Sequence, residues 1–208
     1  MLLRPLQRDE LPVPAARLAR WLIGKTLVRQ HPAGRMIGRI VETEAYVVGD
    51  ASGHAYRGKT ERNASLFLEP GHAYIYFVYG CWFSLNVSAG RVGIGTGVLL
   101  RALEPLEGLE LMAANRPGSR LADLARGPGR LATALGITRE LDGLDLCAGG
   151  GPLWLADAER KRGRVAAGPR IGISVETHRP LRFFEVGNPS VSGPRSVTRA
   201  LAREAEAS

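Results

Sequence analysis

The segment from Tyr74 to Asn86 constrains the fold most, because it is typical of two short strands joined by a turn. Residues 74–78 are aromatic or branched, as strands prefer. Gly80 suits a turn, and residues 82–87 can return as the second strand. We therefore predict a β-hairpin with Tyr79 at or near its tip. An aromatic ring exposed on a turn needs an external partner, and the alternative is that Tyr79 folds back onto the core.

The charge of the chain favours an anionic partner. The net charge is +8, and lysine occurs only at positions 25, 59 and 161, so the remainder of the 28 basic residues are arginine. Arginine pairs with phosphate through two hydrogen bonds, although an arginine excess also follows from GC-rich coding. An exposed Tyr79 ring and a basic surface together fit the DNA minor groove, where flat side chains wedge between base pairs.

Length and composition indicate one soluble intracellular domain spanning residues 1–208. No internal repeat or linker is visible, and residues 196–208 suggest a weak helix or a frayed tail. Cys81 and Cys147 are far apart and show no zinc spacing, so we expect no metal site and a reducing compartment. The charged N-terminus differs from a signal peptide, and no run approaches about 18 apolar residues, so we expect no membrane association.

Hydrophobic patterns and turn residues place the remaining elements. Two helical regions are expected at 12–24 and from about 109 to 114, and a helix–turn–helix at 121–136. A long polar loop spans 49–65 and a basic loop 159–170. The other strands are expected at 25–30, 36–46, 96–103, 170–175 and 181–186.

The strand at 41–46 carries the most suggestive carboxylates. Alternation puts Glu42, Glu44 and Tyr46 on one face and Val41, Thr43 and Ala45 on the other. Carboxylates two residues apart lie about 7 Å from each other, so each raises the pKa of the other where water is excluded. Such a face is usually solvated, and it gains a chemical role only if it lines a cleft.

Several basic side chains occupy positions suited to function. Arg101 sits inside an apolar strand, where a charge must be paired or used. His54 and Arg62 lie in the long polar loop, although a lone loop histidine is usually a surface residue. Arg126 and Arg130 flank a GlyProGly turn before a helix, which can bind a DNA phosphate, although an ordinary helix connection has the same pattern.

Base excision from DNA would explain these features together. The hairpin would enter the base stack while a nucleotide swings out, and Tyr46 and Tyr76 would sandwich its base. Glu44 would activate a water aimed at the sugar and stabilise a cationic transition state. The strand and the hairpin contain no lysine, so we expect hydrolysis without a Schiff base. A non-catalytic minor-groove nucleic-acid-binding module is the main alternative, and a carbohydrate hydrolase using Glu42 and Glu44 is a weaker one.

The same motifs, taken in order, resemble the 3-methyladenine (alkyladenine) DNA glycosylase family. The resemblance covers about residues 12–192, and only the combination of motifs is specific. It is carried by GluThrGluAlaTyr at 42–46, His54 with ArgAsn at 62–63, TyrIleTyrPheValTyrGly at 74–80 with Asn86, LeuLeuArgAlaLeuGluProLeuGluGly at 99–108, GlyProGlyArgLeu at 127–131, ArgIleGlyIle at 170–173 and ProLeuArgPhe at 180–183. The segment between Tyr46 and His54 is short for the family and contains two glycines.

The resemblance implies an α+β fold, namely a single mixed domain with a curved, mainly antiparallel β-sheet, surrounding helices and a projecting β-hairpin. It implies that Glu44 activates the water, that Arg101 lies beside the water and the lesion phosphate, and that Tyr79 intercalates. Residues implied in binding the flipped base are Tyr46, His54, Tyr76 and Asn86, with Asn86 discriminating against the exocyclic amine of guanine.

The resemblance also implies a function. The expected activity is that of a monofunctional glycosylase that flips alkylated or deaminated purines out of duplex DNA and starts base excision repair. Contacts to the DNA backbone are expected from Arg62, Arg126 and Arg130. No metal or organic cofactor is implied, and the protein is expected to act as a monomer in the cytoplasm, on the nucleoid.

Overall fold

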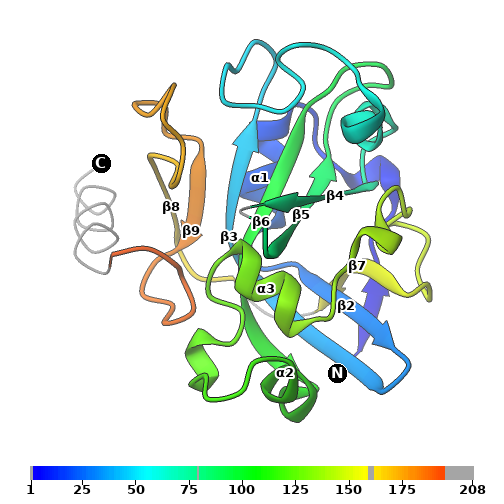
Figure 1. The fold of residues 1–208 in the computed structure, drawn as a ribbon, viewed down its shortest axis with the longest axis vertical. Helices are drawn as coiled ribbons and strands as arrows, with labels where there is room; N and C mark the ends of the chain where they lie inside the picture. Colours follow the sequence, from blue (N-terminus) through cyan, green and yellow to red (C-terminus); the bar gives the residue numbers. More distant parts are fainter. Residues whose placement is uncertain (1, 79, 159–161, 195–208) are drawn as a thin grey trace.

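One antiparallel β-sheet organises the protein in the computed structural model, which describes residues 2–78, 80–158 and 162–194 (Figure 1). The sheet curls into a half-barrel, and its main path runs β1-β7-β2-β3-β6-β5-β4, with β9 joining β3 to β8. The expected α+β architecture is confirmed. The strands are β1 (Leu3–Pro5), β2 (Thr26–His31), β3 (Gly34–Tyr46), β4 (Ala73–Val78), β5 (Trp82–Ser88), β6 (Gly97–Glu107), β7 (Leu153–Ala158), β8 (Val165–Gly168) and β9 (Arg182–Glu185).

The predicted hairpin is present as β4 and β5. Tyr74 pairs with Asn86, and Val78 pairs with Trp82 next to the turn. Aromatic and branched side chains on both strands favour this pairing. Tyr79 lies outside the described residues, so its predicted place at the tip is untested.

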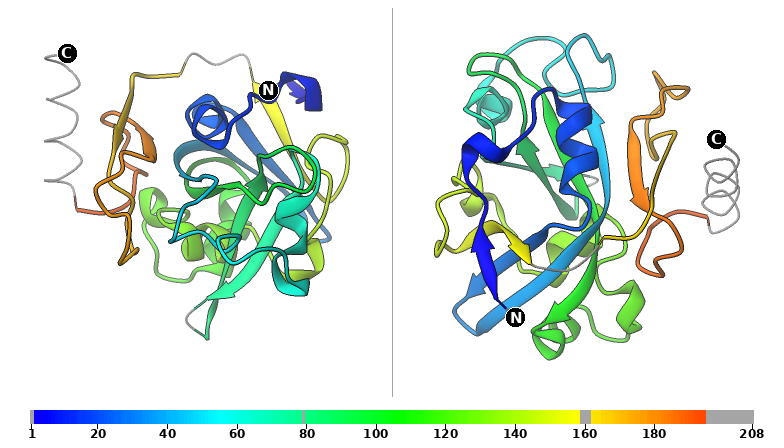
Figure 2. Two further views of the ribbon diagram at one scale, coloured as in Figure 1. Left: turned by 90° about the horizontal axis from the view of Figure 1, so that it is seen from above. Right: turned by 180° about the vertical axis from the view of Figure 1, so that it is seen from behind.

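Helices cover both sides of the sheet. Helix α1 (Ala15–Leu22) lies behind the sheet in Figure 1 and in front of it in the rear view of Figure 2, whereas α3 (Pro128–Ala134) lies on the opposite side. Both contribute buried apolar side chains to the main core. The remaining helices are α2 (Leu109–Asn115) and the 3-10 helices η1 (Arg8–Glu10), η2 (Glu61–Phe67), η3 (Leu121–Asp123) and η4 (Arg139–Leu141).

A β-bulge on β3 changes the predicted alternation of side chains. The pairing of β3 with β6 shifts between Ile40 and Glu42, so Val41 is an extra residue. Thr43 bonds the carbonyl of Ala19 in α1, but Val41 packs in a separate cluster with Phe184. The prediction that Val41 shares a face with Thr43 and Ala45 was therefore wrong.

Three other predictions of secondary structure need correction. Residues 170–175 form bends and not a strand, and Gly172 there has a φ of 80°. The predicted basic loop at 159–170 contains strand β8, because its ValAlaAlaGly segment pairs with β9. In the predicted helix–turn–helix, the first helix is only the short 3-10 helix η3.

Strand β4 forms one edge of the sheet, and its outer side is bonded by side chains. The Ile75 amide donates to the Asp142 carboxylate over 2.7 Å, and Arg139 donates to the Ile75 carbonyl. These two groups take the place of a neighbouring strand and fix the position of β4. Among the described residues, no helix is long and apolar enough to cross a membrane.

Candidate active site

Glu44 lies at the centre of the site and is fully buried, although it is a charged residue type. Its Oε1 atom accepts a 2.7 Å hydrogen bond from the backbone amide of Ile171 and lies 3.3 Å from Arg101. Its Oε2 atom accepts a 3.2 Å bond from the Tyr46 hydroxyl. Burial raises the pKa of Glu44 above its ordinary value, and the Arg101 charge only partly opposes this.

Glu42, two residues earlier, is equally buried but has stronger partners. Its carboxylate lies 2.6 Å from Arg182 Nε and 3.3 Å from Arg101 Nε, and it accepts a 2.7 Å bond from the Ser192 amide. Burial acts to raise the pKa of Glu42, but the charges of Arg101 and Arg182 outweigh it and hold that pKa low. The two carboxylates therefore differ in character: Glu42 is a fixed charge, and Glu44 is the stronger base.

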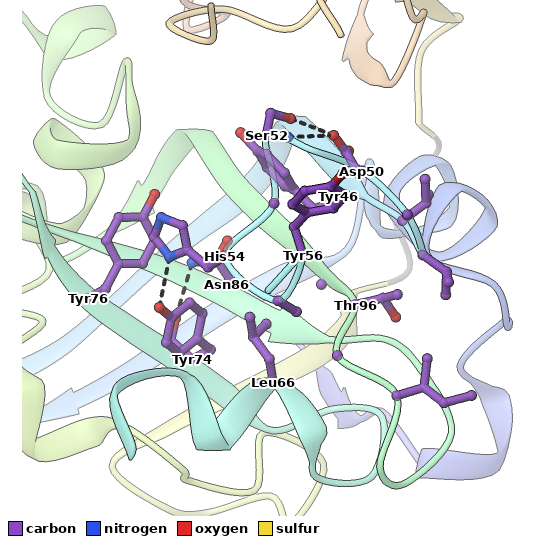
Figure 3. Close-up of a pocket in the computed structure, with 18 of the residues that line it drawn as sticks. Tyr46, Asp50, Ser52, His54, Tyr56, Leu66, Tyr74, Tyr76, Asn86 and Thr96 are labelled. Carbon is purple, nitrogen blue, oxygen red and sulfur yellow. Dashed lines mark hydrogen bonds between the residues drawn. The ribbon is translucent and has the colours of Figure 1, made fainter. Parts of the chain in front are cut away.

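A cavity of about 460 Å³ opens beside Tyr46 and contains the predicted base-binding residues (Figure 3). This volume falls in the range of small-molecule sites. Tyr76 and His54 lie on one side of the cavity in Figure 3, and Tyr46 lies on the other. We call this the aromatic cavity; its labelled residues are Tyr46, Asp50, Ser52, His54, Tyr56, Leu66, Tyr74, Tyr76, Asn86 and Thr96.

Hydrogen bonds and ring contacts fix the polar groups of this cavity. His54 Nδ1 and the Tyr74 hydroxyl lie 2.8 Å apart, and the His54 ring contacts the Tyr76 ring at 4.3 Å between centroids. Burial lowers the pKa of His54, so the imidazole is neutral at neutral pH. Burial also raises the pKa of Tyr74 to about 12, which keeps its hydroxyl protonated. Asn86 is oriented by a 3.2 Å bond from its amide nitrogen to the Tyr74 carbonyl.

A second cavity of about 580 Å³ shares a wall with the first and is lined by arginine. Tyr46, Tyr76, Val78 and Gly172 line both cavities. The arginines that line this second cavity, which we call the basic cavity, are Arg101, Arg116, Arg126 and Arg130. Tyr46 lines both cavities, and its hydroxyl donates to Glu44. The buried carboxylate therefore lies one side chain away from the aromatic cavity and from the basic cavity.

The three arginines predicted to contact the DNA backbone lie in different settings. Arg130 is exposed at the edge of the basic cavity. Arg126 donates to the carbonyls of Val191 and Gly193, so its guanidinium also holds the chain together. Arg62 is exposed near the hairpin and donates a 3.4 Å bond to the Phe77 carbonyl. Within the described part of the chain, no three His, Cys, Asp or Glu side chains gather as a metal site would require.

The site also contains residues that the sequence did not indicate. The Ile171 amide bonds Glu44, and Arg182 and Ser192 hold Glu42. Asp50 and Arg170 form a buried ion pair behind Tyr46. The motifs that contain Ile171 and Arg182 contribute to the family resemblance without revealing these contacts, and a buried ion pair between residues 120 positions apart leaves no local signal.

Comparison with known proteins decides the family. Residues 9–189 match the family model described as methylpurine-DNA glycosylase. The chain belongs to this family. Its function is therefore that of a DNA glycosylase in DNA repair, with DNA as the substrate.

Individual relatives agree with the family match over almost their whole length. A protein of Mesorhizobium japonicum is 61% identical over 193 residues, which cover 93% of this chain and 92% of the relative. A protein of Paraburkholderia phytofirmans is 55% identical, covering 93% and 90%. One from Methanocella arvoryzae is 45% identical, covering 90% and 95%. Each of the three is named as a candidate 3-methyladenine DNA glycosylase.

Proposed function

We propose that this glycosylase flips an alkylated or deaminated purine, 3-methyladenine among them, out of duplex DNA and hydrolyses its N-glycosidic bond with a water activated by Glu44. The observation that carries the proposal is the setting of Glu44: a buried carboxylate of raised pKa, one side chain away from both cavities. A raised pKa makes the carboxylate a better general base near neutral pH.

The aromatic cavity would receive the extruded base. The Tyr46 and Tyr76 rings offer flat apolar faces for stacking, and the fixed side chains of His54 and Asn86 offer polar contacts to the base edge. Because the Tyr74 hydroxyl remains protonated and can donate to His54 Nδ1, His54 Nε2–H is free to donate to the base. Asn86 is proposed to disfavour the exocyclic amine of guanine.

The basic cavity would hold the lesion sugar and its phosphates. Arg101 contacts Glu44 and lines this cavity, so its charge would position both the carboxylate and a phosphate. The water would lose a proton to Glu44 and attack C1′ as the base departs with the bonding electrons. The negative carboxylate would stabilise the cationic sugar in the transition state.

The lysines support hydrolysis without a covalent intermediate. Lys25 pairs with Asp157 over 2.6 Å, and Lys59 is exposed in the polar loop. Neither lines either cavity, and Lys161 lies outside the described residues. We propose a monofunctional reaction that leaves an intact abasic strand.

The remaining contacts are proposed from the family resemblance and the charge of the surface. Tyr79 would fill the space left by the extruded base, and Arg62, Arg126 and Arg130 would bind phosphates of the DNA backbone. We further propose that the hairpin projects into the minor groove, that one chain is sufficient for activity and that the enzyme works on the nucleoid in the cytoplasm.

Replacing Glu44 by glutamine tests the mechanism directly. A duplex carrying one hypoxanthine is incubated with excess enzyme and then treated with alkali, which cleaves the strand at an abasic site. We expect Glu44→Gln to lower the rate of excision by about 10²–10⁴-fold while DNA binding is kept. Glu107→Gln, the same substitution at a half-exposed position of β6, is the matched control and should be fully active. Normal excision by Glu44→Gln would indicate that another side chain is the general base. No excision by either variant or by the wild type would favour the non-catalytic binding module.

A further inference from the structure

Asp50 and Arg170 form an ion pair whose two side chains are completely excluded from solvent. Arg170 Nη1 and Nη2 both donate to the Asp50 carboxylate, which also accepts bonds from the amide and the hydroxyl of Ser52. These bonds hold the pKa of Asp50 low in spite of burial, which acts to raise it. Asp50 is therefore ionised at neutral pH, and the pair joins the loop after β3 to the bend at 170–173.

Arg170 also contacts the strand that carries Glu44. Its Nη1 donates a 3.0 Å bond to the Ala45 carbonyl, and its guanidinium lies 4.7 Å from the centre of the Tyr46 ring. The next residue, Ile171, donates its amide to Glu44 and accepts a 3.4 Å bond from Arg101 at its carbonyl. A single buried side chain thus sets the position of the Tyr46 ring and of the amide that bonds Glu44.

This arrangement is unfavourable if its purpose is stability alone. A buried ion pair recovers its desolvation cost only when its hydrogen bonds are complete. Arg170 Nε is buried without a hydrogen-bond partner, so this pair is incomplete. Replacing a buried ion pair by apolar residues of similar size is often neutral or stabilising, so stability alone does not account for these charges, and their bonds to the surroundings of Glu44 offer another reason for them.

We propose that Asp50 and Arg170 are positioning residues that set the basicity of Glu44 and the wall of the aromatic cavity by holding Ile171 and Tyr46 in place. This inference rests on the proposed function, because it assumes that Glu44 is the general base. Neither residue reaches DNA phosphates, since both side chains are fully buried.

The charges around Glu44 determine the expected pH effect. Arg101 from β6 and Arg182 from β9 favour its ionised form, Glu42 from β3 disfavours it, and the Ile171 amide favours it. Arg101 and Arg182 are also held by Glu42 and Ser192, so they stay in place without Arg170. Loss of the Ile171 bond alone should therefore raise the pKa of Glu44 further.

The test measures single-turnover excision of hypoxanthine against pH for Asp50→Asn and Arg170→Lys. A hydrogen bond to a charged group is lost, so the acidic limb of the pH–rate profile should move to higher pH by about 1–2 units. Binding of an undamaged duplex should be unchanged in both variants. Arg170→Lys keeps a positive charge opposite Asp50 but loses the paired hydrogen bonds and the flat contact with Tyr46.

Glu185→Gln is the matched control, because Glu185 and Arg39 form another buried ion pair outside both cavities. It should lower thermal stability and leave the acidic limb in place. If Asp50→Asn does not fold, Arg170→Lys and Ser52→Ala test the same role. Ser52→Ala removes one bond to Asp50, so it should move the acidic limb of the pH–rate profile in the same direction by a smaller amount.

An acidic limb that stays in place in every folded positioning variant overturns the inference, even if the rate is lower. If Glu44→Gln is inactive at the same time, the proposed function stands and only the positioning role fails. If Glu44→Gln is active, the proposed function itself fails.

Discussion

Replacing either of the two buried glutamates of β3 by glutamine should change the stability of the fold, but in opposite directions. Glu42→Gln and Glu44→Gln each leave one carboxylate facing Arg101 and Arg182, so both create the same net charge. The environment of Glu42 favours its charged form, whereas that of Glu44 disfavours it. Removing the first charge should therefore destabilise the fold, and removing the second should not.

The contacts set the size of the difference. Glu42 is the 2.6 Å partner of the fully buried Arg182, and breaking a buried pair by removing one partner costs about 3–5 kcal/mol. For a chain of this length each kcal/mol lowers Tm by about 2–4 °C, so Glu42→Gln should lose about 6–20 °C. Glutamine at position 44 keeps an oxygen for the Ile171 amide, and its Tm should equal or exceed that of the wild type.

The pH dependence gives each effect a sign. The pKa of Glu42 is lower in the folded state, so its stabilisation is complete above its ordinary pKa of 4.5 and is lost as the pH falls through the lower value. The deficit of Glu42→Gln should shrink in acid. The pKa of Glu44 is higher in the folded state, so its charge destabilises the fold fully above that raised value. This penalty shrinks as the pH falls below the raised value and is gone below the ordinary pKa of 4.5. Any advantage of Glu44→Gln should therefore also disappear in acid.

Thermal unfolding followed by circular dichroism, from acid to neutral pH, measures both variants beside the wild type. Single-turnover excision on the same preparations should show that a stable Glu44→Gln protein has lost activity, as the proposed role of Glu44 requires. Equal destabilisation by the two substitutions at neutral pH would refute the reasoning, since it would mean that the two carboxylates occupy equivalent environments.

Three further outcomes are expected. Arg130→Ala and Arg126→Ala should each reduce the slope of log affinity against log salt by about 0.9. Arg126→Ala should also lower Tm, because Arg126 holds two backbone carbonyls; an unchanged slope in either variant would contradict the proposed phosphate contact. Tyr79→Ala should slow excision from duplex DNA more than from single strands, and equal loss on both would indicate a core residue. Excision of 3-methyladenine, a cationic leaving group, should fall only below the raised pKa of Glu44, whereas hypoxanthine needs protonation and should show a second pH limb; flat profiles for both would count against the mechanism.

The parts of the fold that follow from local patterns were predictable from the sequence. The hairpin of β4 and β5 follows from its aromatic and branched residues around Gly80, and most of β3 was predicted as the strand at 36–46. Strands β1 and β7 were not predicted; β1 has only three residues, too few for a local pattern, and it forms by pairing with β7. The bulge at Val41 was missed because it depends on the register of β6.

The site was predictable to the extent that motifs mark it. Tyr46, His54, Tyr76 and Asn86 lie around one cavity, as the family resemblance implied, and Glu44 lies directly behind it. The burial of Glu44 contradicts the simplest expectation for an acidic strand face, which is solvation. The IleGlyIle pattern favours a strand at 170–175, yet the backbone amide of Ile171 bonds Glu44 instead of a sheet partner.

The side chains bonded along β4 have a consequence for the behaviour of the protein at high concentration. An open sheet edge recruits strands from other molecules and is a common start of aggregation. Asp142 and Arg139 already bond the outward amide and carbonyl of Ile75, so these two groups are not available to a strand of a second molecule. At Ile75 the outer edge of β4 is therefore protected from pairing with a strand of another molecule.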